Sequence, residues 1–151
     1  MMIETKAYGE MEIDQRQKIT LQKGLFGFDC YSNFALLDSE QPPFYWFQSL
    51  DEREIAFVLI DPRIFRPDYC PGVSTEDLEA LGVTREDDED LLIFSIVTIP
   101  EDQSRMTANL QGPLLINRKT RVGRQIISND ERWQVRHLII EEMQHEGDTS
   151  C

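Results

Sequence analysis

The chain has 151 residues, enough for one folded domain with its own core and too few for two comfortable ones. Its formal net charge of −13 disfavours direct binding to nucleic acid, because affinity for phosphates comes from lysine and arginine side chains. The N-terminus has no apolar signal region, and no stretch of about 20 apolar residues exists, so we expect neither secretion nor a membrane span. Cys30, Cys70 and Cys151 are scattered and odd in number, which favours a reduced, cytoplasmic protein.

The first part of the chain predicts short strands joined by turns. Residues 2–6 and 10–13 flank a turn at Gly9 and predict an opening hairpin. Further short strands are predicted over residues 18–21, 34–38, 44–50 and 55–60. The segment 24–28 alternates glycine with large apolar residues and predicts a packed loop, because no helix follows it as a dinucleotide site would require.

Residues 44–47, Phe-Tyr-Trp-Phe, form the densest aromatic run of the chain. On a strand, Phe44 and Trp46 point to one side and Tyr45 and Phe47 to the other. One pair should belong to the core. If the other pair is exposed, it is a candidate anchor for a protein partner, since tyrosine and tryptophan are enriched at binding hot spots; burial of both pairs is the alternative.

One helix is predicted, over residues 74–82. Ser74 can cap its N-terminus, Leu78 and Leu81 share a face, and Gly82 is a natural end. The preceding residues 61–72 contain three prolines and predict a loop without regular structure. The acidic run 87–90 that follows lacks the alternating pattern of a calcium loop, so a solvated loop is expected.

Residues 91–125 determine the expected architecture. The run 91–99 is rich in β-branched residues and predicts a strand buried on both faces. Gly112 and Pro113 divide the next apolar run into strands over 106–110 and 114–116, because proline cannot donate to a central ladder. With a further strand over 122–127, these bends predict a sheet that closes on itself.

Together these elements predict an all-β fold, a small closed β-barrel of antiparallel strands with one short helix. We place the domain at residues 1–140 and a polar tail at 141–151, with residues 133–140 forming either a closing strand or a short helix. Bulky apolar side chains should fill the interior and leave no large cavity. They are Phe57, Leu59, Leu92, Phe94, Ile96, Leu110, Leu115 and Ile126.

No catalytic or metal-binding motif is present in the sequence. His137 and His145 have no partners at metal-ligand spacing, and nucleophile elbows and phosphate loops are lacking. The basic residues 118–124 have no aromatic residues interleaved for stacking on RNA, so a turn paired with acidic residues is expected. We therefore predict no enzymatic activity, no cofactor and no small-molecule substrate.

The order and spacing of several segments resemble the family of the flagellar assembly factor FliW. The matching segments are 24–28, 46–49, 61–62, 93–100, 109–117, 120–125 and 135–137, with Phe34, Leu37, Pro43 and Tyr69 between them. Gly112, Trp133 and Leu138 depart from the family, where alanine, tyrosine and proline are commoner. The resemblance extends to about residue 138.

The resemblance implies a closed β-barrel that binds the C-terminal helical segment of flagellin in the cytoplasm. When flagellin is scarce, it implies binding to the RNA-binding translational regulator CsrA, which relieves repression of flagellin mRNA. The candidate partner-binding residues are Tyr45, Phe47, Asp51, Glu54, Asn109 and Asn117. The competing hypothesis is a ligand-binding or hydrolytic barrel with an internal cavity lined by Tyr45, Phe57 and Ile96.

Overall fold

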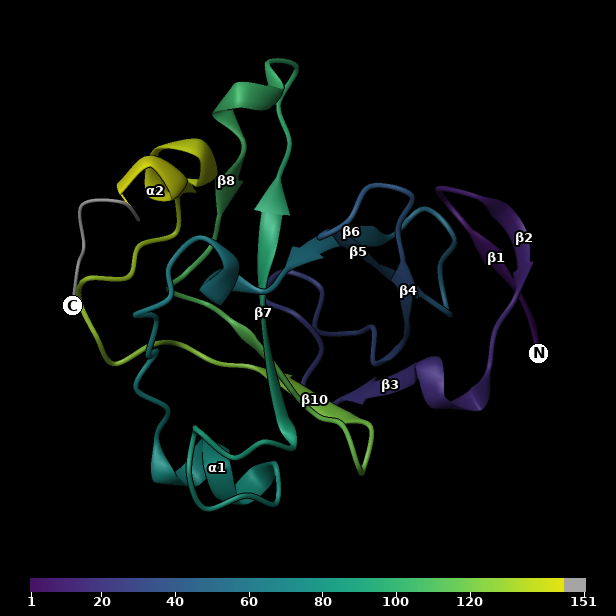
Figure 1. Ribbon diagram of the computed structural model, residues 1–151. Helices are drawn as coiled ribbons and strands as arrows, with labels where there is room; N and C mark the ends of the chain where they lie inside the picture. Colours follow the sequence, from purple (N-terminus) through teal and green to yellow (C-terminus); the bar gives the residue numbers. More distant parts are fainter. Residues whose placement is uncertain (146–151) are drawn as a thin grey trace.

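A computed structural model describes residues 1–145 of the chain (Figure 1). The described part is mostly β-structure with short helical turns, which confirms the predicted fold class. In chain order, the elements are β1 (Met2–Thr5), β2 (Gly9–Glu12), η1 (Gln15–Gln17), β3 (Lys18–Leu21), β4 (Asn33–Asp38), β5 (Tyr45–Ser49), β6 (Ala56–Ile60), η2 (Pro62–Ile64), α1 (Thr75–Ala80), β7 (Leu91–Thr98), η3 (Gln103–Arg105), β8 (Thr107–Ala108), β9 (Leu114–Asn117), β10 (Val122–Gln125), β11 (His137–Leu138) and α2 (Ile139–His145).

The barrel closes through seven strands in the order β7, β6, β5, β4, β3, β10 and β9, with β9 pairing back onto β7. The pairs are antiparallel except β3 with β10, so the prediction of antiparallel strands throughout was wrong at this seam. A β-carbon at Gly123 would lie 3.0 Å from a Leu21 methyl group and 3.1 Å from the Leu115 carbonyl oxygen. The seam therefore needs glycine because the neighbouring strands approach closely there.

The predicted bend at Gly112 and Pro113 separates β8 from β9, and both strands pair with the same edge of β7. The Asn109 side-chain oxygen accepts hydrogen bonds from the backbone N–H groups of Gln111 and Gly112 and holds this turn. Strand β7, the 3-10 turn η3 and β8 form an arm that projects from the barrel (Figure 1).

Alternate side chains of the seven strands fill the barrel. The buried interior residues are Ile19, Leu21, Leu25, Phe34, Phe47, Leu59, Phe94, Leu114 and Ile116, and Phe57, Leu92 and Ile96 pack against them. Of the predicted interior residues, Leu110, Leu115 and Ile126 are buried in a different cluster, on the outside of the barrel wall. For Leu115 the prediction failed because β9 is buried on both faces, so its sequence does not show which residues point inward. Leu110 and Ile126 lie beyond the ends of β8 and β10, where strand alternation no longer applies.

An outer layer covers one side of the barrel wall. It contains Phe65, Tyr69, Leu81, Trp133 and Ile139, which come from the loop 61–73, helix α1 and the C-terminal segment. Helix α1 begins as predicted, with the Ser74 hydroxyl accepting from the Asp77 N–H at 3.1 Å. The loop before it differs from the prediction by containing the short turn η2, which begins at Pro62 and is capped by Asp61.

The C-terminal segment is part strand and part helix. Only His137 and Leu138 pair with β8, and α2 follows directly, so the described residues contain two α-helices where one was predicted. The polar tail predicted from residue 141 is helical up to His145; its residues 146–151 lie outside the described part. Burial of Ile139 and ionic contacts of Glu142 hold this helix, and neither is visible in local sequence.

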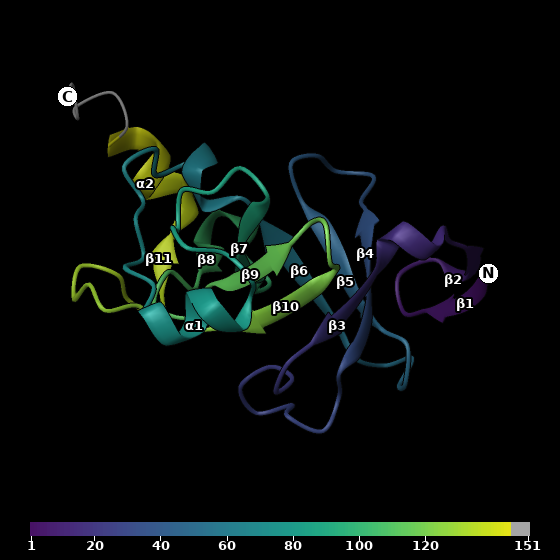
Figure 2. The same ribbon diagram turned by 90° about the horizontal axis from the view of Figure 1, so that it is seen from below.

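The N-terminal hairpin β1–β2 is a separate two-stranded sheet, as predicted. Its Ile3 and Ile13 pack on the outward-facing Ala35 and Leu37 of β4. The hairpin and α2 lie at opposite ends of the molecule in both views (Figures 1 and 2). Within residues 1–145, the helices are all too short or too polar to cross a bilayer.

Candidate partner-binding surface

The structure does not gather the six predicted site residues into one surface. Phe47 is wholly buried and stacks on Phe34 with ring centroids 4.4 Å apart, so it is part of the core. Tyr45 is half-buried and also points inward, with its ring edge-on to Phe94. The choice of Phe47 as an anchor is therefore corrected, because it belongs to the core. Tyr45 packs against the interior and also lines the groove described below, and Phe44 and Trp46 face outward.

Asn117 and Asn109 use their polar atoms within the chain. The Asn117 amide donates to the Leu81 carbonyl at 2.8 Å, and its oxygen accepts from the N–H groups of Lys119 and Thr120. Asn117 is 5% exposed. Both asparagines hold turns, and the prediction that they also contact a partner stays a prediction.

Asp51 and Glu54 lie in the exposed turn between β5 and β6, as predicted. The turn is built by Ser49, whose hydroxyl accepts hydrogen bonds from the N–H groups of Asp51 and Glu52. These carboxylates are accessible to a partner, but they lie apart from the aromatic side chains that face outward on β5.

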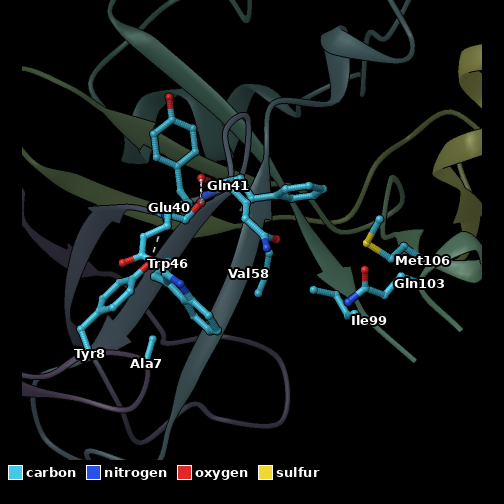
Figure 3. A pocket seen from close by; sticks show the side chains of 12 residues that line it. Ala7, Tyr8, Glu40, Gln41, Trp46, Val58, Ile99, Gln103 and Met106 are labelled. Carbon is cyan, nitrogen blue, oxygen red and sulfur yellow. Dashed lines mark hydrogen bonds between the residues drawn. The ribbon is translucent and has the colours of Figure 1, made fainter. Parts of the chain in front are cut away.

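The outward-facing aromatic residues belong to a groove of about 480 Å³ on the surface of the barrel (Figure 3). Phe44 lies directly before β5, Trp46 lies in β5 and Val58 lies in β6, and all three line the groove. Ile99 and Met106 come from the projecting arm, on the other side of the groove from the N-terminal hairpin (Figure 3). The groove thus has an apolar lining shared by three parts of the chain.

Polar residues form the rest of the groove. They are Tyr8, Ser39, Glu40, Gln41, Tyr45 and Gln103, with Ala7 from the hairpin turn. The Glu40 N–H donates to the Tyr8 hydroxyl at 3.2 Å, and the Ser39 hydroxyl donates to the Phe44 carbonyl at 2.7 Å. These bonds tie the N-terminal hairpin and the loop before β5 into one wall. An apolar lining with a polar rim is typical of a protein-binding site.

Sequence reasoning identified the aromatic run 44–47 but chose Tyr45 and Phe47 from it, and it missed the contributions of Tyr8, Ile99 and Met106. Ile99 is 46% exposed although it ends a strongly apolar run, and that exposure is the signal that it serves a surface. Sequence gives no sign that the hairpin turn at Tyr8 lies beside β5, because these segments are about 40 residues apart.

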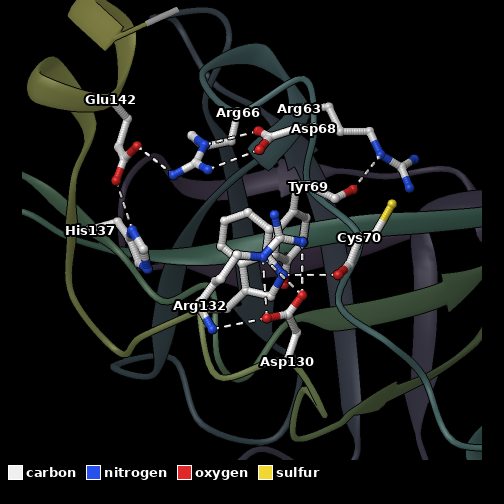
Figure 4. A network of polar contacts seen from close by, with 10 residues as sticks. Arg63, Arg66, Asp68, Tyr69, Cys70, Asp130, Arg132, His137 and Glu142 are labelled. Carbon is white, nitrogen blue, oxygen red and sulfur yellow. Dashed lines mark hydrogen bonds and ion pairs between the residues drawn. The ribbon is translucent and has the colours of Figure 1, made fainter. Parts of the chain in front are cut away.

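A second cluster of polar groups surrounds Trp133 in the outer layer (Figure 4). Arg66 bonds Asp68 and, at 2.8 Å, Glu142, and the second Glu142 oxygen is 2.8 Å from the His137 ring. The guanidinium groups of Arg66 and Arg132 lie 4.7 and 4.8 Å from the Trp133 ring. The network fastens α2 to the loop 61–73.

The hydrogen bonds and nearby charges in this network favour the charged forms of its acidic side chains. Burial alone would raise the pKa of Glu142, but hydrogen bonds from His137 and Arg66 outweigh burial and lower that pKa below its ordinary value. The Arg66 hydrogen bond likewise lowers the pKa of Asp68. Each acidic group of the network has a cationic or imidazole partner, which suits a structural tie between segments.

The competing hypothesis of a ligand-binding or hydrolytic barrel requires an internal cavity lined by Tyr45, Phe57 and Ile96. In the structure these side chains are packed against the buried interior cluster. A hollow of about 310 Å³ at the barrel mouth is lined by Leu36, Tyr45, Leu92 and Phe94, with Asp61 as its one carboxylate. Asp61 already accepts a hydrogen bond from the Arg63 N–H. Across the described residues, no three histidine, cysteine or acidic side chains are grouped so as to hold a metal ion.

Of the basic residues at 118–124, three are paired with acidic ones, as the sequence predicted, and Arg121 forms no ion pair within residues 1–145. Arg118 and Lys119 contact the two oxygens of Asp90 at 2.8 and 3.1 Å. Arg124 contacts Asp77 of α1 at 2.7 Å. These pairs join the turn and β10 to the helix and the acidic loop after it.

Comparison with known proteins gives a consistent result. The family model described as "FliW protein" matches residues 2–139. The flagellar assembly factor FliW of Treponema denticola is 46% identical over 147 residues, which cover 97% of this chain and 99% of the relative. The flagellar assembly factor FliW of Treponema pallidum is 44% identical over 143 residues, which cover 95% of this chain and 94% of the relative. A crystal structure of the flagellar assembly factor FliW superposes with a TM-score of 0.82 at 32% identity, covering 92% of this chain and 96% of that one.

Proposed function

Because this chain belongs to the FliW family of flagellar assembly factors, we propose that it binds the C-terminal segment of flagellin and, when free of flagellin, the translational regulator CsrA. Binding CsrA would relieve repression of flagellin mRNA. The observation that carries this proposal is the identity of 46% to a flagellar assembly factor along nearly the whole of both chains. The protein acts in this proposal through its surface, in the cytoplasm, and without a cofactor.

The groove supports the flagellin part of the proposal. An amphipathic helix binds by laying its apolar face into a hydrophobic groove, with anchors at successive turns. Phe44, Trp46 and Val58 offer apolar surface in the groove, and Ile99 and Met106 offer it on the arm. The helix would lie between the N-terminal hairpin and the arm.

The net charge supports the regulator part. A protein with a charge of −13 attracts a basic surface over a distance set by the Debye length, about 8 Å at physiological salt. Association with CsrA should therefore slow as sodium chloride rises, whereas dissociation should change less. Stopped-flow measurements at several salt concentrations test this, and a rate independent of salt would contradict the role given to charge.

Calorimetry with a synthetic C-terminal flagellin peptide tests the groove. Ile99→Glu places a carboxylate in the apolar lining and should weaken binding about tenfold or more. Ile127→Glu is the matched control, because Ile127 is 63% exposed and does not line the groove. Absence of heat with the unaltered chain at micromolar concentration would overturn the flagellin proposal. Equal weakening by both substitutions would overturn the groove as its site.

A further inference from the structure

The loop between β3 and β4 exposes two aromatic side chains outside the groove. Phe26 is 54% exposed and Phe28 37% exposed. Phe28 contacts Phe57 of β6 edge-on, with ring centroids 5.2 Å apart, so this loop lies against the strand that follows the β5–β6 turn. Large aromatic side chains seldom stay exposed on a fixed backbone without a partner, since their burial contributes much binding energy.

The backbone that presents these rings is tightly held. Leu25 is buried in the barrel, the Phe26 N–H donates to the Gln125 side chain at 2.8 Å, and the Phe28 N–H donates to the Leu25 carbonyl at 2.7 Å. Gly24 has a φ of +63°, and a β-carbon there would lie 2.6 Å from the Phe28 carbonyl oxygen. A preordered loop loses little conformational entropy on binding, which favours its use as a docking element.

Exposed carboxylates flank the aromatic loop. Asp29 follows it directly, and Asp51, Glu52 and Glu54 occupy the adjacent β5–β6 turn. The Leu50 N–H donates to the Asn33 carbonyl at 2.8 Å, which joins the turn to the base of the loop. Lys23 and Arg53 are the cationic residues of these segments, so acidic groups outnumber them.

These carboxylates have no ionic partner within the described part of the chain. None of Asp29, Asp51, Glu52 and Glu54 forms an ion pair within residues 1–145, and the same holds for Glu76 and Glu79 of α1, although Asp77 and Asp90 are paired with Arg124, Arg118 and Lys119. The unpaired acidic charge is therefore available to an external cation. The carboxylates beside the loop are distinguished by the two exposed aromatic rings next to them.

We propose that Phe26, Phe28, Asp29, Asp51, Glu52 and Glu54, here called the aromatic–acidic face, form the docking surface for a basic protein partner that presents an apolar side chain to the rings. This inference rests on the proposed function, in which that partner is CsrA. A second copy of this chain would bring like charges together and is disfavoured as the occupant. The face shares no residue with the groove, so its test is independent of flagellin binding.

The test measures the binding kinetics of purified CsrA to two variants of the face and to a control variant for each. Phe26→Ala should increase the dissociation rate about tenfold, and Asp51→Lys with Glu54→Lys should decrease the association rate about tenfold at low salt. Val135→Ala removes an apolar side chain that is 52% exposed elsewhere and should have little effect. Glu76→Lys with Glu79→Lys changes the net charge equally on α1 and should slow association much less. Thermal melts establish that each variant is folded.

The outcomes separate the inference from the function on which it rests. Loss of affinity in the variants of the face, with controls unchanged, supports the proposal. Normal CsrA binding by the Phe26→Ala variant and the charge-reversed variant overturns the aromatic–acidic face and leaves the proposed function standing. Equal slowing by the two charge-reversed pairs shows a general effect of net charge and overturns the local acidic site. Failure of the unaltered chain to bind CsrA overturns both.

Discussion

The interior of the barrel and the layer outside it are both buried, but different interactions hold them together. The interior consists of alternate side chains on paired strands, such as Phe47, Leu59 and Phe94. The outer layer joins loops and helices, and polar bonds fix its position: the Tyr69 hydroxyl donates to the Leu110 carbonyl and the Trp133 ring N–H to the Cys70 carbonyl. The comparison teaches that strand pairing positions the interior, whereas individual hydrogen bonds and ion pairs position the outer layer.

The largest effect is expected from truncating the interior. Phe94→Ala should lower the free energy of unfolding by about 3–5 kcal/mol, because the side chain is buried against Tyr45 and the barrel wall cannot collapse into the space. Unfolding in urea measures this change in the free energy of unfolding. A midpoint equal to that of the unaltered chain would rule out Phe94 as a core residue.

The ionic tie of α2 should contribute less. Glu142→Gln should lower the free energy of unfolding at pH 7 by about 1–3 kcal/mol, because it weakens bonds to Arg66 and His137. Glu141→Gln, on the exposed side of the same helix, is the control. Equal stability of the two variants would mean that Ile139 alone holds the helix.

The same residue predicts a dependence on pH. Since folding lowers the pKa of Glu142, its stabilising contribution is complete above the ordinary value of 4.5 and is lost as the pH falls through the lower folded value. As the pH is lowered from 5, the free energy of unfolding should therefore fall less steeply for Glu142→Gln than for the unaltered chain. Unchanged steepness would contradict the assigned shift.

A single buried hydrogen bond in the outer layer should matter still less. Tyr69→Phe removes the hydroxyl that donates to the Leu110 carbonyl at 2.6 Å and should cost about 1–2 kcal/mol. Burial raises the pKa of the Tyr69 phenol, so the hydroxyl stays protonated as a donor. Tyr45→Phe is the control, because the Tyr45 hydroxyl forms no hydrogen bond within the described part of the chain. A larger loss of stability in Tyr45→Phe than in Tyr69→Phe would contradict the role given to the Tyr69 hydroxyl.

The smallest effect is expected at the surface pairs. Arg118→Ala removes one of two cations that contact Asp90, and Lys119 remains. Exposed ion pairs contribute little because water and salt screen them. The urea midpoint at moderate salt should be indistinguishable from that of the unaltered chain, and a marked decrease would show that this turn supports the outer layer.

The sequence determined the elements of the barrel and its closure, because a strand's period of two and the breaks at Gly112 and Pro113 are local properties of the chain. It also determined the helix beginning after Ser74, which depends on a side chain three residues from its partner. The resemblance to FliW proteins determined the family. Pairing of the basic residues with acidic ones was predicted from the number of carboxylates in the chain, although Asp90 and Asp77 lie 28 and 47 residues from their partners Arg118 and Arg124.

Only the tertiary structure decided which aromatic pair faces outward, because apolar residues occur on both faces of β5 and either side could have been the interior. It showed the structural role of Asn109 and Asn117, whose side chains form hydrogen bonds that hold turns. It also assembled the groove and the outer layer, where Arg66 meets Glu142 across 76 residues of sequence. Such contacts depend on how the strands close in space, and no local pattern of residues encodes them.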